Sequence, residues 1–289
     1  MTAPPGAAPA PLTAIAALRS YLAARRAGGP VGFVPTMGAL HDGHAALIRR
    51  ARAENATVVV SIFVNPLQFD RAEDLERYPR TLDADVALCA SLGVDAVFAP
   101  LPGEMYPTPP AMRISVGTLA DHLCGASRPG HFEGVATVVM KLLQIVQADR
   151  AYFGEKDAQQ LAVIRRLVAD FNLPVEIVGL PTVREPDGLA MSSRNRRLSA
   201  GGRQTALALI RALRAVAEAI ASGKPPATAR EAGVATLPGG DAVQLDYLEV
   251  VDAATMQPVD RVDRPVIVAG ALWVDGVRLI DNLPAGPPA

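Results

Sequence analysis

A run of apolar, mostly β-branched residues at Thr57–Val64 (TVVVSIFV) most strongly constrains the fold of this chain. A strand without polar alternation is typical of a sheet that is covered on both faces. Shorter runs of the same kind alternate with segments of helical periodicity, which predicts βαβ units and a mostly parallel sheet. The predicted strands are Val31–Val34, Thr57–Val64, Ala96–Phe98, Ala151–Phe153 and Val175–Val178, and the predicted helices are Thr13–Arg26, His44–Ala53, Asp83–Leu92, Gly134–Val146 and Ala158–Asp170.

The pattern changes after the segment Arg184–Gly188, where two helical segments are followed by three strand-like runs. The helices are predicted at Gly202–Ser222 and Ala227–Thr236, and the strands at Leu245–Val251, Val266–Leu272 and Gly276–Ile280. We therefore expect an α/β fold: a doubly wound, Rossmann-like parallel sheet over residues 12–182 and a second, smaller α+β domain over residues 183–289. The Ala/Pro-rich residues 1–11 are expected to be a disordered tail, and Ala285–Ala289 a frayed end.

Composition excludes several classes of protein. The chain has 289 residues, is 50% hydrophobic and has a net charge of −1, which argues against a basic protein that coats nucleic acid. No uncharged apolar run approaches the ~20 residues that span a bilayer. The two cysteines, Cys89 and Cys124, match no zinc or redox motif, as expected of reduced thiols in the cytoplasm. We expect a soluble, cytoplasmic protein that contacts neither nucleic acid nor membrane.

In a doubly wound fold the ligand lies where strands end and helices begin, and the loop after the first predicted strand holds His41 and His44 around Gly43. A glycine at a helix N-terminus lets a phosphate approach the backbone, and imidazole donors stabilise charge on a phosphoryl group in transit. A structural histidine pair or a weak metal site is the alternative, although no third ligand follows nearby. The spacing Gly38-x4-Gly43 imitates a Walker A loop but lacks its Lys-Ser/Thr.

Two further loops carry neutral or anion-binding groups. Asn65 and Gln68 follow the long apolar strand and offer donors to a carboxylate or hydroxyl, although Asn-Pro also favours a simple turn. Arg128 and His131 precede a predicted helix and could pair with an anion, or belong to a solvated loop.

The last two segments add cations and hydroxyls. Lys156 stands at a helix start beside glycine, where it suits a phosphate, while Asp157 stands where an N-cap belongs. Ser192, Ser193 and Arg194 follow the domain boundary and would suit a lid that closes over phosphates. Convergence of these groups with the two histidines predicts a local cationic site for a polyphosphate in a nearly neutral chain.

These segments resemble a known family. HDGH at 41–44 and MSSR at 191–194 resemble the two signatures of the HxGH nucleotidyltransferase superfamily. The set PTMGALHDGH, FVNPLQF, YPRT, RPGHFEGV, GEKDAQQL and AMSSRN closely resembles the pantothenate synthetases, or pantoate–β-alanine ligases, from about residue 12 to 282. The resemblance implies ATP-dependent joining of pantoate to β-alanine through a pantoyl-adenylate, with Mg²⁺ accompanying ATP, release of AMP and pyrophosphate, and a homodimer.

The resemblance also implies roles for individual residues. His44, His41, Lys156 and Arg194 would be catalytic. The residues implied to bind ATP are Met37, Gly43, Gly154, Asp157, Val183, Met191, Ser192 and Ser193. Gln68, Gln160 and Asn65 would hold pantoate, and Arg128 and His131 would lie near β-alanine and the phosphates. The family's acidic stretch reads LDAD here, so Asp85 is a weak candidate for a magnesium ligand, and Ala158 stands where the family often has an aromatic residue.

The expected chemistry is in-line attack of a carboxylate on the α-phosphorus of ATP, which needs positioning and charge stabilisation but no enzyme nucleophile. The second domain would act as a lid that excludes water from the acyl-adenylate. The alternative within the superfamily is a nucleotidyltransferase that acts on another small acceptor. A non-catalytic RNA-binding module is disfavoured by the net charge and by the single tryptophan.

Overall fold

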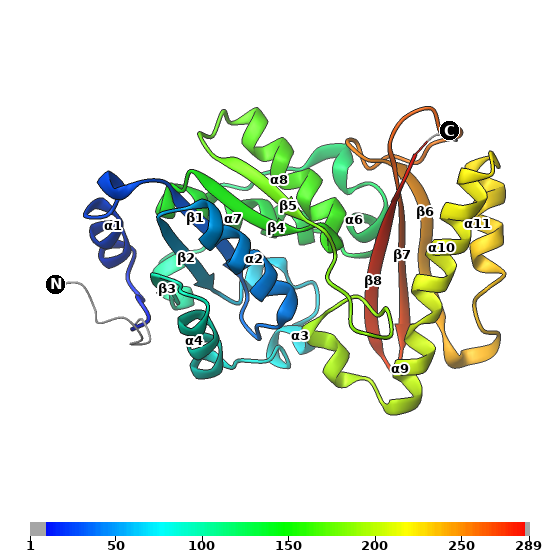
Figure 1. Cartoon of the computed structure of the whole chain (residues 1–289), viewed down its shortest axis with the longest axis horizontal. Helices are drawn as coiled ribbons and strands as arrows, with labels where there is room; N and C mark the ends of the chain where they lie inside the picture. The colour runs from blue at the N-terminus through cyan, green and yellow to red at the C-terminus, as the bar shows by residue number, and fades with distance from the viewer. Residues whose placement is uncertain (1–9, 287–289) are drawn as a thin grey trace. The chain divides into compact units, whose positions relative to one another are not determined.

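The computed structural model describes residues 10–286, and its contacts divide them into two compact units (Figure 1). Unit 1 comprises residues up to Ser115 together with Gly130–Gly154 and Val163–Pro181. Unit 2 comprises Val116–Pro129, Glu155–Ala162 and the chain from Thr182 onward. Residues 1–9 and 287–289, which hold most of the two expected tails, lie outside the described part of the chain.

Unit 1 contains a parallel five-stranded sheet in the order β3-β2-β1-β4-β5, which confirms the predicted doubly wound architecture. Its strands are β1 (Val31–Thr36), β2 (Thr57–Ile62), β3 (Ala96–Phe98), β4 (Arg150–Gly154) and β5 (Glu176–Leu180). Its helices are α1 (Ile15–Ala23), α2 (Asp42–Glu54), α3 (Ala72–Glu76), α4 (Leu82–Ser91), α5 (Pro102–Met105) and α7 (His131–Val146). Helix α8 (Ala158–Asp170) begins in unit 2 and continues in unit 1.

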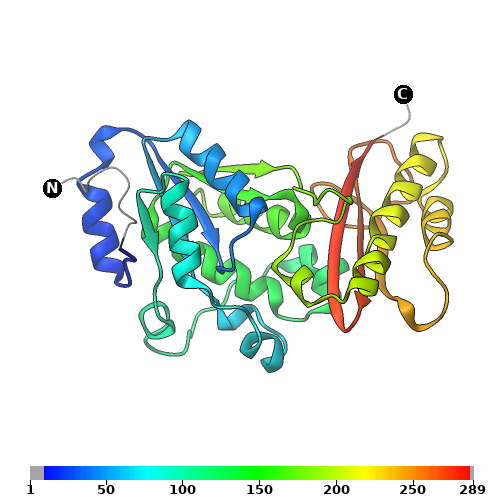
Figure 2. The same cartoon turned by 60° about the horizontal axis from the view of Figure 1, so that its bottom comes forward.

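The sheet of unit 1 is covered on both faces, as its apolar strands require. Leu47 and Ile48 of α2 and Cys89 of α4 pack with strand residues in one buried cluster. Figures 1 and 2 show α2 and α4 on this face of the sheet and α7 on the other. The sheet order reverses between β1 and β4, the place where doubly wound folds bind ligands at the carboxyl ends of the strands.

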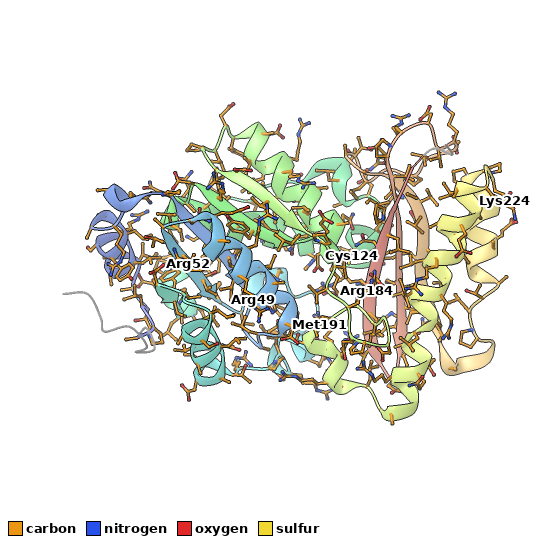
Figure 3. All side chains as sticks on the ribbon, in the orientation of Figure 1. Arg49, Arg52, Cys124, Arg184, Met191 and Lys224 are labelled. Carbon is orange, nitrogen blue, oxygen red and sulfur yellow. The ribbon has the colours of Figure 1, made fainter. Side chains whose placement is uncertain are left out.

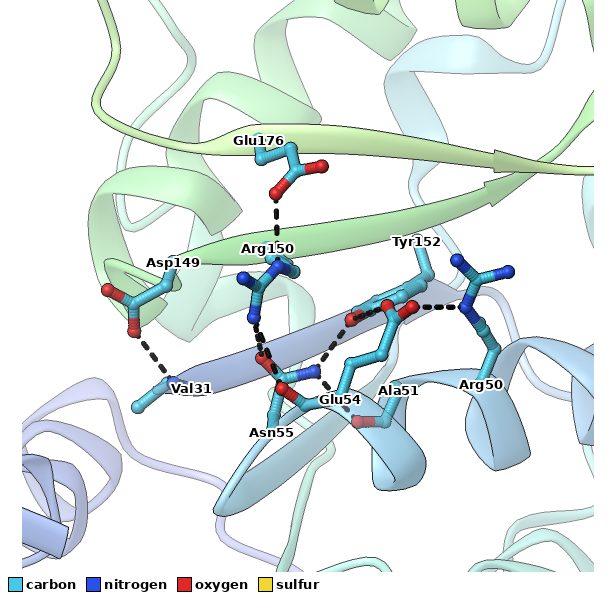
Figure 4. Close-up of polar contacts among 9 residues, drawn as sticks. All are labelled: Val31, Arg50, Ala51, Glu54, Asn55, Asp149, Arg150, Tyr152 and Glu176. Atoms are coloured by element: carbon cyan, nitrogen blue, oxygen red, sulfur yellow. Dashed lines mark hydrogen bonds and ion pairs between the residues drawn. The ribbon is translucent and has the colours of Figure 1, made fainter. Parts of the chain in front are cut away.

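Polar contacts fix the far end of α2 against β4 (Figure 4). The Asn55 side chain donates to the Tyr152 hydroxyl at 2.6 Å, and that hydroxyl donates to a Glu54 carboxylate oxygen at 2.8 Å. Glu54 also pairs with Arg50, and a guanidinium nitrogen of Arg150 donates to the Glu54 carbonyl at 3.1 Å. Because buried polar groups are costly unless they are paired, this network fixes the direction of the helix whose other end carries His41 and His44.

Unit 2 has the expected α+β character, with an antiparallel sheet in the order β6-β7-β8. It also includes Val116–Pro129 and Glu155–Ala162, which precede the predicted boundary at residue 182. Its strands are β6 (Gln244–Asp252), β7 (Val266–Val274) and β8 (Val277–Ala285), and its helices are α6 (Leu123–Ser127), α9 (Ala200–Ala206), α10 (Ala208–Ala221) and α11 (Pro226–Val234). Leu209, Leu213 and Val216 of α10 pack against the sheet in the core of this unit. In the described part of the chain, no helix combines the length and the hydropathy needed to span a bilayer.

The elements largely follow the predicted positions, but several ends differ. Strand β8 runs to Ala285, past the predicted end at Ile280, so Ala285 pairs with Val266 in the sheet instead of belonging to a frayed end. Helices α2 and α7 begin before the predicted His44 and Gly134, at Asp42 and His131. The predicted helix Gly202–Ser222 is two helices that meet at Leu207.

Candidate active site

The loop after β1 approaches α2 through a strained turn. Gly38 and Ala39 both have positive φ, +81° and +50°, and alanine tolerates this conformation only where contacts enforce it. Asp85 of α4 supplies them, because its two carboxylate oxygens accept the backbone N–H groups of Ala39 at 2.9 Å and Leu40 at 2.8 Å. Asp85 therefore fixes the backbone that leads into His41.

His41 and His44 form the start of α2. His41 is the N-cap, and its Nδ1 accepts the N–H of Gly43 at 3.1 Å, while Nδ1 of His44 accepts the N–H of His41 at 3.3 Å. The ring centroids lie 4.1 Å apart. Since Nδ1 accepts in both rings, each neutral ring carries its proton on Nε2. The arrangement joins two imidazole donors to the positive end of a helix dipole, which favours an anion.

Four predicted residues come together beside this loop. Gln68 donates through Nε2 to the Met37 sulfur at 3.0 Å and accepts at Oε1 from Nδ2 of Asn65 at 3.1 Å. Nδ1 of His131 lies 2.7 Å from the Gln68 carbonyl oxygen. Asn65 is 1% exposed and Gln68 8% exposed, so both amides are held in a buried polar network rather than in a solvated turn.

Tyr106 is part of this network, although no sequence motif pointed to it. Its hydroxyl donates to Oδ1 of Asn65 at 2.9 Å. Burial raises the pKa of Tyr106 to about 12, so the hydroxyl remains a donor at neutral pH. The hydrogen bond joins segments 41 residues apart, and only the tertiary fold reveals it.

Helix α7 packs directly on the 3₁₀ turn Pro66–Gln68. A Cβ on Gly134 would lie 2.2 Å from the Leu67 carbonyl oxygen, and the Gly134 carbonyl accepts Nδ2 of Asn65 at 3.1 Å. Glycine is therefore required at this position for the backbone of the helix to reach the amide pair.

The remaining predicted residues lie in unit 2, except Gly154, which ends β4 in unit 1. Lys156 and Asp157 form a 3₁₀ turn before α8, which also carries Gln160. The N–H of Met191 donates to the Val183 carbonyl at 3.0 Å, so these two residues lie side by side. The Ser192 hydroxyl accepts the N–H of Arg194 at 3.3 Å and caps the 3₁₀ turn Ser193–Arg197.

Arg128 follows α6, and its N–H donates to the Cys124 carbonyl at 2.9 Å. The carbonyl oxygen of His122 accepts Nε2 of the buried Gln159 at 2.8 Å. Figure 3 shows Arg184 and Met191 on the segment that leads from β5 to α9, and Cys124 on α6.

Among residues 10–286, no three His, Cys, Asp or Glu side chains are grouped so that they could hold a metal ion. Besides the two loop amides, the Asp85 carboxylate accepts the Thr81 hydroxyl at 3.2 Å. The polar groups gathered near the histidines are mainly neutral amides and imidazoles, which suit an anionic or hydroxylated small molecule.

Comparisons with known proteins identify the family of this chain. Residues 11–284 match the family model for pantoate–β-alanine ligase. A pantothenate synthetase from Acidothermus cellulolyticus is 56% identical over 260 residues, which cover 89% of this chain and 86% of the relative. The chain spans about half the length of other curated relatives, which are named bifunctional pantoate ligase/cytidylate kinase.

Solved structures give the same result. A crystal structure of pantothenate synthetase from Thermus thermophilus is 50% identical, with a TM-score of 0.88 over 96% of this chain and 99% of that chain. The pantoate–β-alanine ligase of Francisella tularensis, complexed with β-γ ATP and β-alanine, is 36% identical, with a TM-score of 0.80 over 96% and 97% of the two chains. The chain therefore belongs to the pantoate–β-alanine ligase family of enzymes.

Proposed function

We propose that this chain joins pantoate to β-alanine in two steps. The pantoate carboxylate attacks the α-phosphorus of ATP, forming pantoyl-adenylate and releasing pyrophosphate. The deprotonated amine of β-alanine then attacks the acyl carbon, forming the amide and releasing AMP. Family membership and the ATP and β-alanine complex of the Francisella tularensis relative support the substrates.

The observation that carries the first step is the start of α2. His41 and His44 present Nε2 donors at a helix N-terminus, where charge on a transferring phosphoryl group is stabilised. A carboxylate is already ionised at neutral pH and needs no base to attack. We assign His41 and His44 to stabilising the transition state of this step.

We also assign nucleotide contacts to residues of unit 2. Lys156 and Arg194 supply basic side chains for the phosphates, and Ser192 and Ser193 add hydroxyl donors. The proposal assigns ATP contacts also to Met37, Gly43, Gly154, Asp157, Val183 and Met191.

The amide network of unit 1 supports the proposed pantoate site. Gln68 and Asn65 are buried and hydrogen-bonded to each other, so the position of the Gln68 amide is fixed; we assign both residues, together with Gln160, to a hydroxylated carboxylate. Arg128 and His131 are assigned to β-alanine and the phosphates. Mutual fixing of the amides keeps them pre-organised, which lowers the cost of binding.

Magnesium would accompany ATP rather than occupy a site of protein carboxylates. The only acidic candidate, Asp85, has both oxygens occupied by the amides of Ala39 and Leu40 and by Thr81. ATP oxygens and water form a coordination shell typical of Mg²⁺. Cytoplasmic location, a homodimer and a lid role for the smaller domain remain predictions.

The test is the order of product release. Pyrophosphate is expected with ATP and pantoate alone, and AMP only after β-alanine is added. His44→Ala is expected to slow pyrophosphate release by on the order of 10²–10³, because it removes one donor to the transition state. The exposed Asp83→Asn provides a control that leaves the rate unchanged.

Two results would contradict the proposal. If His44→Ala turns over nearly as fast as the unsubstituted chain, His44 does not stabilise the transition state. Pyrophosphate release that requires a phosphorylated acceptor instead of pantoate would favour the nucleotidyltransferase alternative.

A further inference from the structure

Two adjacent buried polar residues stand in the middle of β8. Asp281 is 5% exposed and Asn282 is 7% exposed. Leu279 and Val277 of the same strand belong to the apolar core of unit 2. An apolar pair would serve a sheet core equally well, and burying polar groups is unfavourable unless each is hydrogen-bonded. Neither residue belongs to the motifs assigned to ATP, pantoate or β-alanine.

Asn282 holds the turn that carries Lys156. Its Nδ2 donates to the carbonyl oxygens of Glu155 at 2.9 Å and Lys156 at 2.8 Å. One amide group thus uses both of its N–H donors on two consecutive peptide units. These two bonds fix the backbone of the turn to the central part of β8, and they thereby fix the Cα position of Lys156.

Asp281 holds the segment that carries Val183 and Met191. Its carboxylate binds Arg184 through both oxygens, at 2.6 Å to Nη1 and 3.0 Å to Nη2. Nη1 of Arg184 also donates to the Gly188 carbonyl at 3.2 Å. Arg184 pairs with Ala190 in an antiparallel bridge, next to the hydrogen bond from Met191 to Val183. A bidentate pair of this kind fixes direction as well as distance.

The two anchors are connected. The N–H of Asn282 donates to Oδ1 of Asp281 at 2.8 Å, so the carboxylate that binds Arg184 also restrains the peptide that carries the amide. The turn that carries Lys156 and the Val183–Met191 segment are therefore both held by hydrogen bonds to one dipeptide, Asp281–Asn282, in a hydrogen-bonded strand.

We propose that Asp281 and Asn282 are positioning residues for the nucleotide site: Asn282 places Lys156, and Asp281, through Arg184, places the Val183–Met191 segment. This inference rests on the proposed function for the assignment of both segments to ATP. Small displacements of groups that hold a reacting substrate cost up to about 10²-fold in rate, so the pair affects nucleotide binding and the first chemical step.

The first experiment measures two quantities on each variant: affinity for α,β-methylene-ATP by calorimetry, and pantoate-dependent exchange of pyrophosphate into ATP. Asn282→Ala is expected to weaken analogue binding and slow exchange by about 10- to 100-fold, with an unchanged KM for pantoate. The control is Leu279→Ala, a core substitution on the same strand as Asp281 and Asn282. It is expected to lower thermal stability and leave both quantities unchanged.

The second experiment separates positioning from general structural damage. If Asn282 acts through Lys156, then Asn282→Ala has no further effect on either quantity in a Lys156→Ala background, although it still lowers thermal stability. Asp281→Asn acts through the other segment, so its effect is expected to persist and multiply in that background. Should Asn282→Ala fail to fold, Asn282→Ser, whose hydroxyl can replace one of the two bonds, is expected to give a smaller loss.

The outcomes are distinguishable. Full analogue affinity and exchange in the Asn282 variants, or effects that multiply with those of Lys156→Ala, would overturn the inference. Absence of pantoate-dependent exchange in the unsubstituted chain would overturn the proposed function alone, because the analogue-binding cycle still tests the positioning role.

Discussion

Asp85 shows how a residue outside the histidine motif can determine the geometry of that motif. The residue is 3% exposed, and its carboxylate accepts the N–H groups of two loop residues that precede His41. Asp85→Asn places an N–H₂ group against at least one of these N–H donors. We expect a loss of about 1–3 kcal/mol in the free energy of unfolding, measured by urea denaturation. We also expect slower pyrophosphate release.

The matched control is Asp83→Asn, an exposed residue on the same helix, which is expected to lower stability much less, because only the attraction of an exposed charge to the helix N-terminus is lost. Equal stability of the two variants would show that the carboxylate does not restrain the loop.

Residues that act through local motifs were predictable from the sequence. Met37, Asn65, Gln68 and His131 were predicted separately, and the structure joins them in one network. Tyr106, Asp281 and Asn282 were not predicted, since their contacts join segments far apart in the chain. The sequence indicated Asp85 only as a candidate metal ligand. Its role in the loop could not be predicted, because the N–H groups that it binds lie 45 and 46 residues away in the chain.

At the scale of the element, the positions of the main strands and helices were easier to predict than their ends. Strand β3 and helix α8 have the predicted bounds because apolar runs and periodicity define them. Helix α2 begins early because a histidine ring acts as its N-cap, a role in which propensity favours Ser, Thr, Asp and Asn. The Ala-rich segment of α9 and α10 gave no sign of the break at Leu207, since alanine favours continued helix.

The contact between α7 and the turn Pro66–Gln68 makes a further prediction. Gly134→Ala puts a Cβ 2.2 Å from the Leu67 carbonyl oxygen and 2.7 Å from the Gln68 nitrogen. The helix or the turn must move, which we expect to cost about 1–3 kcal/mol of stability and to raise the KM for pantoate. Thermal denaturation and initial rates measure the two effects.

Gly103 provides the control, because a Cβ there meets nothing within 4 Å. Gly103→Ala is expected to be neutral or slightly stabilising. An unchanged KM in Gly134→Ala would indicate that the turn does not position the pantoate amides.

At the scale of the whole molecule, sequence patterning predicted the architecture because short apolar strands separated by helices leave few alternatives. Right-handed crossovers restrict the order of parallel strands, and the observed order β3-β2-β1-β4-β5 matches the first five strands of the order 3-2-1-4-5-6 that is typical of doubly wound dinucleotide-binding sheets. The pattern could not predict which side-chain contacts tie the segments together, because these depend on the relative placement of elements after folding.

Burial of several weak acids in unit 1 predicts how stability depends on alkaline pH. Burial raises the pKa of Cys89, Tyr106 and Tyr152 to about 12. In the unfolded chain these groups ionise near pH 9 for the thiol and pH 10 for the hydroxyls. The folded state therefore retains protons that the unfolded state loses, so this stability is fully present below pH 9 and is lost as pH rises toward 12.

Urea denaturation at intervals from pH 8 to pH 11 is expected to show this decline. Tyr152→Phe lowers stability at pH 8 by removing the hydrogen bonds to Asn55 and Glu54, but it also removes one titrating group. Its stability is therefore expected to fall less steeply above pH 10 than that of the unsubstituted chain. The difference in slope approaches 1.4 kcal/mol per pH unit, the value for one proton, at its largest. Parallel profiles for the two chains would show that the Tyr152 hydroxyl ionises equally well in the folded and unfolded states.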